Sequence, residues 1–347
     1  MAELQAASNP YPPPRPDKRG LRAGRAEGGD EGGGEAVKEL GWKVKLRAYL
    51  EIIRYPLFPI PIVATLPGAV AASGDRITWR FPLALLTAAL GYFAGMMKND
   101  YFHRETDAIA HPERPIPSGR LSPREVFIAA SSLYVLCLIL GFSMNWKAGL
   151  MVVLLVMISH LYNAIFKERG IWGSISLPLG MGLLSVFGAL CVSGGVPMLA
   201  LYAFGANFLF DFGTHIVTTF KDIERDRRLG IITTPIQIGV KPALILSGCA
   251  TASAFLIALI PFLRGEAGPI YLVWLGWALL VVVLSRVPLM MEQTERNGYL
   301  ALKGAMLASI SFFPALGAVR MPILTSTLIP SLSLISWYLL RRARQEV

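Results

Sequence analysis

Residues 125–166 read EVFIAASSLYVLCLILGFSMNWKAGLMVVLLVMISHLYNAIF. The stretch holds two runs of mostly apolar residues, 125–143 and 148–166, with a short polar link between them. Each run approaches the ~20 residues with which an α-helix crosses the hydrocarbon core of a bilayer. We therefore predict that the stretch forms two consecutive membrane-spanning helices.

Apolar runs of similar length recur along most of the chain. Of the 347 residues, 54% are hydrophobic and 16% are charged, whereas soluble domains carry roughly 25% charged residues. The polar residues are too few to cover a soluble globule of this size. We predict an all-α fold, a polytopic membrane bundle of nine to ten transmembrane helices. The candidate spans are 55–73, 81–98, 125–143, 148–166, 172–193, 197–220, 242–263, 269–289, 303–319 and 322–340, of which the last two fit either two spans or one span and a partly inserted helix.

The first 45 residues differ from the rest in composition. They are rich in proline, glycine and charge, as in NPYPPPRPDKRG at 9–20. Such a segment cannot bury enough apolar surface to fold. We predict a disordered basic tail on the cytoplasmic side over 1–45 and one membrane domain over 46–347.

The formal net charge of +10 is also typical of nucleic-acid-binding proteins, but the placement of the basic residues argues against such a partner. They gather in alternate connections between the candidate spans, as the positive-inside rule predicts for connections that stay in the cytoplasm. We expect no nucleic-acid partner. We expect an integral membrane protein of a bacterial or archaeal cell membrane, with residues 98–120 on the cytoplasmic side.

Residues 98–120, KNDYFHRETDAIAHPERPIPSGR, form a polar connection between two apolar runs. If the preceding helix continues through the connection, several of its polar side chains fall on one helical face, namely Asp100, His103 or Arg104, and Asp107. Acidic side chains stacked in this way repel each other unless a cation lies between them. A hard divalent cation with oxygen ligands meets that need.

A second acidic patch follows the candidate span 197–220. Asp222 and Asp226 are four residues apart, which places both on one face of a helix, and basic residues interleave with them. Mg²⁺ is usually held by one or two carboxylates together with substrate phosphates. Two such faces over one cavity would bind a diphosphate through Mg²⁺, with arginine and lysine completing the neutralisation. The plainer alternative is that both patches are ordinary solvated connections.

The positions of the acidic residues also bear on the class of membrane protein. A transporter would carry paired ionisable residues near the middle of the membrane, together with repeats or broken helices. Here most acidic residues lie at the cytoplasmic ends of the candidate spans, which favours an enzyme. Asp211 lies within a span, where an ionisable group is costly and indicates a function. It precedes Asp222 by about three helical turns, so we expect it to face the same cavity and to touch the acceptor.

Three stretches resemble the UbiA superfamily of intramembrane prenyltransferases. NDYFHRETD at 99–107, followed by RPIPSGR at 114–120, resembles the first aspartate-rich motif of that superfamily. KDIERDRRLGIITTPIQIG at 221–239 resembles the second motif, and LYNAIFKERGIWG at 161–173 resembles the exit of the fourth span. The resemblance covers roughly residues 45–320 and keeps the order of the motifs.

This resemblance implies a fold of about nine helices around a central cavity that is open to the lipid. It implies two Mg²⁺ ions that bind the diphosphate of an isoprenoid, whose C–O bond ionises before an acceptor attacks the carbon. The implied partners are a prenyl diphosphate, a small acceptor and membrane lipid. Our first choice of acceptor is an aromatic quinone precursor. The alternatives are an ether-lipid or tetrapyrrole acceptor, a membrane terpene cyclase of the same fold, and a non-catalytic lipid-binding member.

The resemblance also implies roles for individual residues. The metal ligands would be Asp100, Asp107, Asp222 and Asp226. The catalytic residues would be the same four aspartates with Tyr162 and Lys167. The substrate-binding residues would be Asn99, His103, Arg104, Arg114, Asp211, Lys221 and Arg225.

The sequence departs from the superfamily at three positions in or next to these motifs. His103 stands where the first motif has its middle aspartate, and Thr219 stands where many members have a further aspartate. Arg225 stands where a glycine is common. Fewer carboxylates lower the negative charge around the metals, which implies a weaker Mg²⁺ site. Imidazole is a poor ligand for Mg²⁺, but a protonated His103 would contact phosphate directly.

Overall fold

The structure is a computed structural model in which residues 31–74 and 76–342 are described. Contacts divide the chain into two units, Met1–Lys43 and Val44–Val347, and helix α1 (Glu31–Ile52) crosses that boundary. Residues 1–30 of the predicted tail lie outside the described residues. Residues 31–45 are helical, in contrast to the disorder that their composition predicts. The run EAVKEL at 35–40 consists mostly of residues with high helix propensity, which accounts for the difference.

The second unit is an all-α bundle with one very short pair of strands. The long helices that follow α1 are α2 (Pro59–Ala72), α3 (Arg80–Phe102), α5 (Pro123–Met144), α6 (Trp146–Leu161), α7 (Ile171–Ser193), α8 (Met198–Thr218), α11 (Val240–Leu263), α12 (Pro269–Met291), α13 (Glu295–Ala315) and α14 (Pro322–Arg342). The short elements are η2 (Tyr55–Leu57), α4 (Arg104–Ala110), η3 (Tyr162–Phe166), β1 (Arg169–Gly170), η4 (Phe220–Asp222), α9 (Ile223–Leu229), β2 (Ile232–Thr233), α10 (Thr234–Ile238) and η5 (Leu316–Val319).

All ten candidate spans are helical. Within the described ranges, nine helical segments are long and apolar enough to cross a membrane. The tenth window, α8, is 21 residues long but includes Asn207, Asp211 and His215, which make it more polar. It packs against α7, α11 and α13. The prediction of nine to ten membrane helices is confirmed, and two of the candidate segments fall in the region 303–340.

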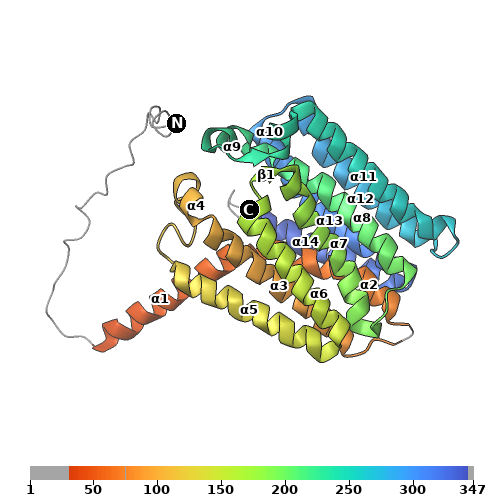
Figure 1. Ribbon diagram of the computed structural model, residues 1–347, viewed down its shortest axis with the longest axis horizontal. Helices are drawn as coiled ribbons and strands as arrows, with labels where there is room; N and C mark the ends of the chain where they lie inside the picture. The colour runs from red at the N-terminus through yellow and green to blue at the C-terminus, as the bar shows by residue number, and fades with distance from the viewer. Residues whose placement is uncertain (1–30, 75, 343–347) are drawn as a thin grey trace, which may run out of the picture. The chain divides into compact units, whose positions relative to one another are not determined.

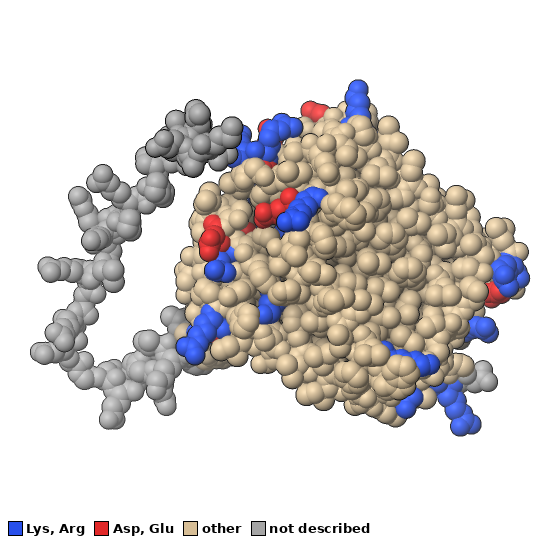
Figure 2. Space-filling model, viewed as in Figure 1, with Lys and Arg blue, Asp and Glu red and all other residues tan. Residues whose placement is uncertain are grey.

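Charged and apolar side chains are distributed as a membrane requires. Figure 1 shows the long helices of the second unit side by side, with α4, α9, α10 and β1 at one end. On the face drawn in Figure 2, charged residues gather toward the two ends and leave a broad uncharged middle. Large apolar side chains are exposed on the long helices, for example Ile139 (60%) and Leu284 (65%). An apolar surface of this kind is suited to contact with lipid.

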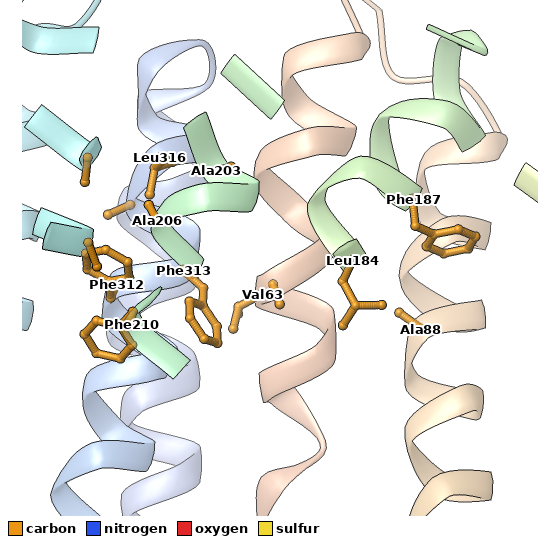
Figure 3. Packing of buried hydrophobic residues seen from close by; sticks show 14 of the residues in the cluster. Val63, Ala88, Leu184, Phe187, Ala203, Ala206, Phe210, Phe312, Phe313 and Leu316 are labelled. Atoms are coloured by element: carbon orange, nitrogen blue, oxygen red, sulfur yellow. The ribbon is translucent and has the colours of Figure 1, made fainter. Parts of the chain in front are cut away.

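Close packing places α2, α7, α8 and α13 in the centre of the bundle. A Cβ atom at Gly68 would lie 1.6 Å from the carbonyl oxygen of Ser185, so a glycine in α2 is needed for α7 to approach this closely. Asn207 of α8 donates a hydrogen bond to Oγ of Ser185 at 3.0 Å. Phe210 of α8 stacks on Phe312 of α13, with ring centroids 4.2 Å apart (Figure 3). These contacts fix α8, which carries much of the site described below.

The polar connection 98–120 is not one continuous helix. Helix α3 ends at Phe102, and His103 has φ −98° and ψ 12° before α4 begins. The expectation of a single helical face is therefore wrong, because Asp100 belongs to α3 and Asp107 to α4. Of these two carboxylates, Asp107 lines the cavity described below and Asp100 does not.

Candidate functional site

A cavity of about 400 Å³ lies where the polar connections meet the ends of the long helices. We call it the head cavity. Its walls include residues of α2, α3, α4, α7, α8, α9 and α13. Of the residues predicted from the motifs, those that line it are Asn99, His103, Asp107, Arg114, Tyr162, Lys167, Asp211, Lys221, Asp222, Arg225 and Asp226. The fold thus brings both aspartate motifs and the exit of α6 to one place.

Asp107 and Arg114 are paired residues of the first motif and its tail that line the cavity. Asp107 is buried in α4, and its Oδ2 lies 2.7 Å from Nη1 of Arg114. The loop that carries Arg114 is held by Arg120, which donates to a carboxylate oxygen of Glu51 at 2.6 Å. Gly119 in this loop has φ 75°, a conformation that favours glycine. The loop therefore has a shaping role and also delivers one cation to the cavity.

Asp100 is not among the residues that line the head cavity, although it is 4% exposed and belongs to the same motif. Its Oδ1 lies 3.2 Å from Nη2 of Arg54, which does line the cavity. Arg54 has φ 49° and ψ 55° and is the one described residue other than glycine with positive φ. A non-glycine residue in this conformation is strained, and such strain is often found at functional sites.

Lys167 reaches the cavity from the exit of α6, where Tyr162–Phe166 wind as a π-helical turn. Turns of this kind occur frequently at functional sites. Nζ of Lys167 donates to Oδ1 of Asn99 at 3.0 Å, and Nδ2 of Asn99 donates to Oδ1 of Asn163 at 2.9 Å. Burial and the nearby charge of Arg54 lower the pKa of Lys167 to about 8. Lys167 is therefore a buried cation in the cavity wall, and its Nζ points toward the first aspartate motif.

Asp222 and Asp226 of the second motif both line the cavity, as their spacing predicts. Asp222 pairs with two cations, at 2.6 Å from Nζ of Lys221 and 2.5 Å from Nη2 of Arg225. Asp226 is buried and has no ion pair within the described part of the chain. Burial, together with the charge of Asp222, raises the pKa of Asp226 to about 6.

A short strand pair joins the second motif to the exit of α6. β1 and β2 are parallel, with Arg169 opposite Ile232 and Gly170 opposite Thr233. The backbone N–H of Ile171 donates to Oε1 of Gln237 at 2.8 Å. A Cβ at Gly170 would lie 2.0 Å from the same oxygen atom, and Gly170 has φ 57°, so this position requires glycine.

His103 does not supply the positive charge that the sequence suggests. Its Nδ1 lies 3.1 Å from a carboxylate oxygen of Glu168, and its Nε2 is buried without a hydrogen-bond partner among the described residues. Burial and the charge of Lys167 lower the pKa of His103 to about 4. The ring is therefore neutral at neutral pH in this arrangement, and it is a hydrogen-bonding group rather than a cation.

The inner part of the head cavity is mostly apolar and includes Ile60, Met181 and Met306. Asp211 lies in this part, as its distance from Asp222 predicts. It has no ion pair or hydrogen bond with any residue in the described ranges. One turn further along α8, His215 approaches the hydroxyl of Tyr162 at 3.4 Å from its Nε2.

Some residues of the wall were not singled out by the sequence, and one predicted residue lies elsewhere. Arg104 is not among the lining residues, because its guanidinium packs over the ring of Tyr101 at 4.9 Å and donates to the backbone of that residue. Arg54, Tyr92 and His215 line the cavity without belonging to a motif. In the sequence, Arg54 could have been singled out as a charged residue directly before the apolar run that forms α2.

The lining residues include the type of ligand atom that Mg²⁺ prefers. Asp107, Asp222 and Asp226 offer hard oxygen ligands from the two separate motifs. Within the described ranges, no group of three or more His, Cys, Asp or Glu side chains is placed to hold a metal ion alone. Mg²⁺ normally binds one or two carboxylates and completes its shell with substrate phosphates and water. The donor set therefore fits Mg²⁺ that arrives with a phosphorylated substrate.

Solved structures share this fold. A structure of digeranylgeranylglyceryl phosphate synthase has a TM-score of 0.65 and 24% identity, and the match covers 80% of this chain and 99% of that one. A UbiA homologue from Archaeoglobus fulgidus, bound to DMAPP and Mg²⁺, has a TM-score of 0.55 and 17% identity, with coverage of 85% and 99%. These likenesses define the class of protein, an intramembrane helical bundle with a cavity at one end.

Sequence comparison identifies the family. The UbiA prenyltransferase family matches residues 61–310. A digeranylgeranylglyceryl phosphate synthase of Methanothermobacter thermautotrophicus is 32% identical over 286 residues, which cover 79% of this chain and 98% of that protein. This chain belongs to the UbiA prenyltransferase family, and it is an integral membrane enzyme.

Proposed function

We propose that this prenyltransferase adds a geranylgeranyl chain, taken from its diphosphate, to a glyceryl phosphate that already carries one such chain, with Mg²⁺ as cofactor. The name of the similar archaeal enzyme specifies a product with two geranylgeranyl groups on one glyceryl phosphate. The step that adds the second group must form an ether with the free glycerol hydroxyl. This proposal replaces the aromatic quinone precursor, because the comparisons favour the ether-lipid alternative.

The observation that carries the proposal is the amphipathic character of the head cavity. Charged residues crowd its polar end, and apolar residues of α2, α7 and α13 line its inner part. A substrate with an anionic head and a long apolar chain matches both regions at once. Both the proposed donor and the proposed acceptor have this form. A purely polar or purely apolar pocket would match only one part of either molecule.

The charge balance of the lining supports a metal cofactor. The cationic side chains are Arg54, Arg114, Lys167, Lys221 and Arg225, and the carboxylates are Asp107, Glu168, Asp211, Asp222 and Asp226. The two sets are equal in number, so the lining alone has no surplus positive charge for a diphosphate. Mg²⁺ bound with the substrate supplies that surplus.

The reaction follows from this placement. The residues Arg114, Lys167 and Arg225 bind and orient the diphosphate, and their charges stabilise it as it leaves. The bond between the first carbon of the chain and the diphosphate oxygen breaks, and its electron pair departs with the diphosphate. The acceptor hydroxyl then forms a bond to that carbon. Asp211 takes the hydroxyl proton, because it is a carboxylate in the inner cavity with no partner among the described residues.

The test uses the purified full-length protein in detergent with radiolabelled geranylgeranyl diphosphate. Geranylgeranylglyceryl phosphate, 4-hydroxybenzoate and no acceptor are compared, each with Mg²⁺ and with a chelator. The proposal expects a labelled ether product only with the glyceryl phosphate and only with Mg²⁺. Product from the aromatic acceptor alone would contradict it, and hydrocarbon formed without an acceptor would indicate a cyclase.

A further inference from the structure

Two polar side chains lie one turn apart on α8, in the part of the head cavity that is otherwise mostly apolar. Asp211 and His215 both line the cavity. Their spacing of four residues places them on the same face of the helix, with Cβ atoms about 5–6 Å apart. A single substrate oxygen atom can therefore lie between the carboxylate and the imidazole ring.

Behind the imidazole ring, two buried hydroxyl groups form a chain. Nδ1 of His215 lies 3.2 Å from Oγ of Ser174, and that oxygen atom lies 2.8 Å from Oγ1 of Thr234. Ser174 is 1% exposed and Thr234 is 0% exposed. Neither of the two lines the head cavity, so the Nδ1 side of the ring faces the protein interior.

The two hydroxyl groups determine which ring nitrogen carries the hydrogen. Within the described ranges, Thr234 has no side-chain partner besides Ser174, and Ser174 has none besides Thr234 and His215. Both hydroxyl hydrogens find an acceptor in only one arrangement, in which Thr234 donates to Ser174 and Ser174 donates to Nδ1. A neutral imidazole ring then carries its hydrogen on Nε2 and is a donor there.

The Nε2 side of the ring is turned to the cavity and makes only a weak contact. Nε2 lies 3.4 Å from the hydroxyl oxygen of Tyr162, which also lines the cavity. This distance is longer than the usual range of an N–H···O hydrogen bond, about 2.7–3.2 Å. The donor at Nε2 is therefore available to an oxygen atom of a substrate.

We propose that His215 donates a hydrogen bond from Nε2 to the free hydroxyl oxygen of the acceptor, and that Thr234 is a positioning residue that acts through Ser174. This inference rests on the proposed function. The hydroxyl group gives its proton to Asp211, and one lone pair of its oxygen forms the new bond to carbon. The other lone pair accepts the hydrogen bond from His215. The two side chains of α8 thus fix the direction in which the acceptor oxygen faces the carbon.

The hydroxyl chain is attached to closely packed elements. A Cβ at Gly173 would lie 2.8 Å from the backbone oxygen of Phe166, so the first turn of α7 packs closely against the exit of α6. Helix α10, which carries Thr234, is joined to the start of α7 by the hydrogen bond from Ile171 to Gln237. The segment that follows the second aspartate pair therefore also sets the direction of the imidazole ring.

The test compares the binding of two ligands to each protein variant. The ligands are geranylgeranylglyceryl phosphate and an analogue that has hydrogen in place of the free hydroxyl group. Dissociation constants are measured for the purified full-length protein in detergent, with Mg²⁺ and inorganic diphosphate present so that no transfer takes place. The ratio of the analogue's constant to the acceptor's constant reports the contribution of the hydroxyl group.

The variants separate a direct contact from a structural role. His215→Asn keeps a polar group near Nδ1 but none at Nε2, so the ratio should fall by about fivefold, the contribution of one hydrogen bond. His215→Gln, whose amide reaches the place of Nε2, should retain part of the ratio. Thr234→Val should lower the ratio by a smaller factor and leave the analogue's constant unchanged. The control is His160→Asn, because His160 is exposed and is not among the lining residues.

Two results would overturn the inference while the wild-type protein still forms the ether product. In one, folded His215→Asn and Thr234→Val proteins keep the wild-type ratio, so His215 does not bind the hydroxyl group. In the other, both dissociation constants rise in parallel, so the ring only shapes the cavity. Thr234→Val nearly keeps the shape of the side chain and carries the test if His215→Asn fails to fold. A wild-type protein that binds neither ligand would overturn the proposed function together with this inference.

Discussion

Nζ of Lys167 donates a hydrogen bond to Oδ1 of Asn99 at 3.0 Å, across 68 residues of sequence. The bond joins the exit of α6 to the first motif at the end of α3, and it aims a cation at the place where the diphosphate would bind. The lysine is held by a side chain of the motif itself. The same hydrogen bond therefore fixes the position of the Lys167 side chain and the direction of its charge.

Replacement of Lys167 by glutamine should lower kcat by about 100-fold, the usual effect of removing one group that stabilises developing charge. The long amide side chain keeps a donor for Asn99 but removes the positive charge that faces the leaving diphosphate. The matched control is Lys147→Gln, because Lys147 is exposed and donates to the backbone carbonyl of Gly194, outside the cavity lining. Steady-state kinetics check both variants. Equal activity of the two variants would show that the charge at 167 is not used.

Asp226→Asn should raise the Mg²⁺ concentration needed for half-maximal activity by about tenfold or more. Even the loss of a residue that only supports a metal ligand lowers metal affinity by about this factor. Asp226 is buried in the cavity wall without an ion pair among the described residues, so its carboxylate is available to a metal. Glu224→Gln is the control on the same helix, because Glu224 is exposed and pairs with Arg227. Activity is titrated against Mg²⁺ for each protein. Identical curves for Asp226→Asn and wild type would exclude Asp226 as a ligand.

Asp211→Asn should lower kcat by about 100-fold while it leaves the KM for the donor nearly unchanged. The lost group accepts a proton, and general-base catalysis contributes about this factor, whereas the donor's diphosphate binds at the other end of the cavity. Asp211→Glu should restore part of the activity. A variant that binds the donor poorly, or that keeps its full turnover, is incompatible with Asp211 as the proton acceptor.

Arg54 allows a separate test of backbone strain. Arg54→Ala and Arg54→Gly both remove the guanidinium that pairs with Asp100, so both should lower thermal stability and activity. The glycine variant should be more stable than the alanine variant by about 1 kcal/mol, because φ 49° is costly for any residue with a Cβ and not for glycine. Thermal unfolding in detergent measures the difference. An alanine variant that is equally stable would show that the positive φ at Arg54 costs nothing.

The sequence alone was sufficient for the membrane helices and for most of the polar end of the site. Long apolar runs require helices in a bilayer, since every backbone polar group must be paired within its own segment. The spacing of Asp222 and Asp226 predicted that both would reach the cavity, and both line it, although Asp222 ends η4 and Asp226 belongs to α9. Asp211 followed from the same periodicity.

The parts that sequence reasoning missed depend on packing or on a local break. Asp100 pairs with Arg54 and is not a lining residue, and no pattern in 98–120 predicts this pairing. Arg54 belongs to no motif, and its place in the cavity wall depends on how the segment before α2 folds.

The most direct test of the central claim is a competition between two acceptors for the wild-type protein. Geranylgeranylglyceryl phosphate and 4-hydroxybenzoate are supplied at equal concentration with geranylgeranyl diphosphate and Mg²⁺, and mass spectrometry quantifies both products. The account predicts that nearly all product is the glyceryl phosphate with two ether-linked chains. A prenylated benzoate as the main product would contradict the proposed function and would identify the aromatic compound as the preferred acceptor.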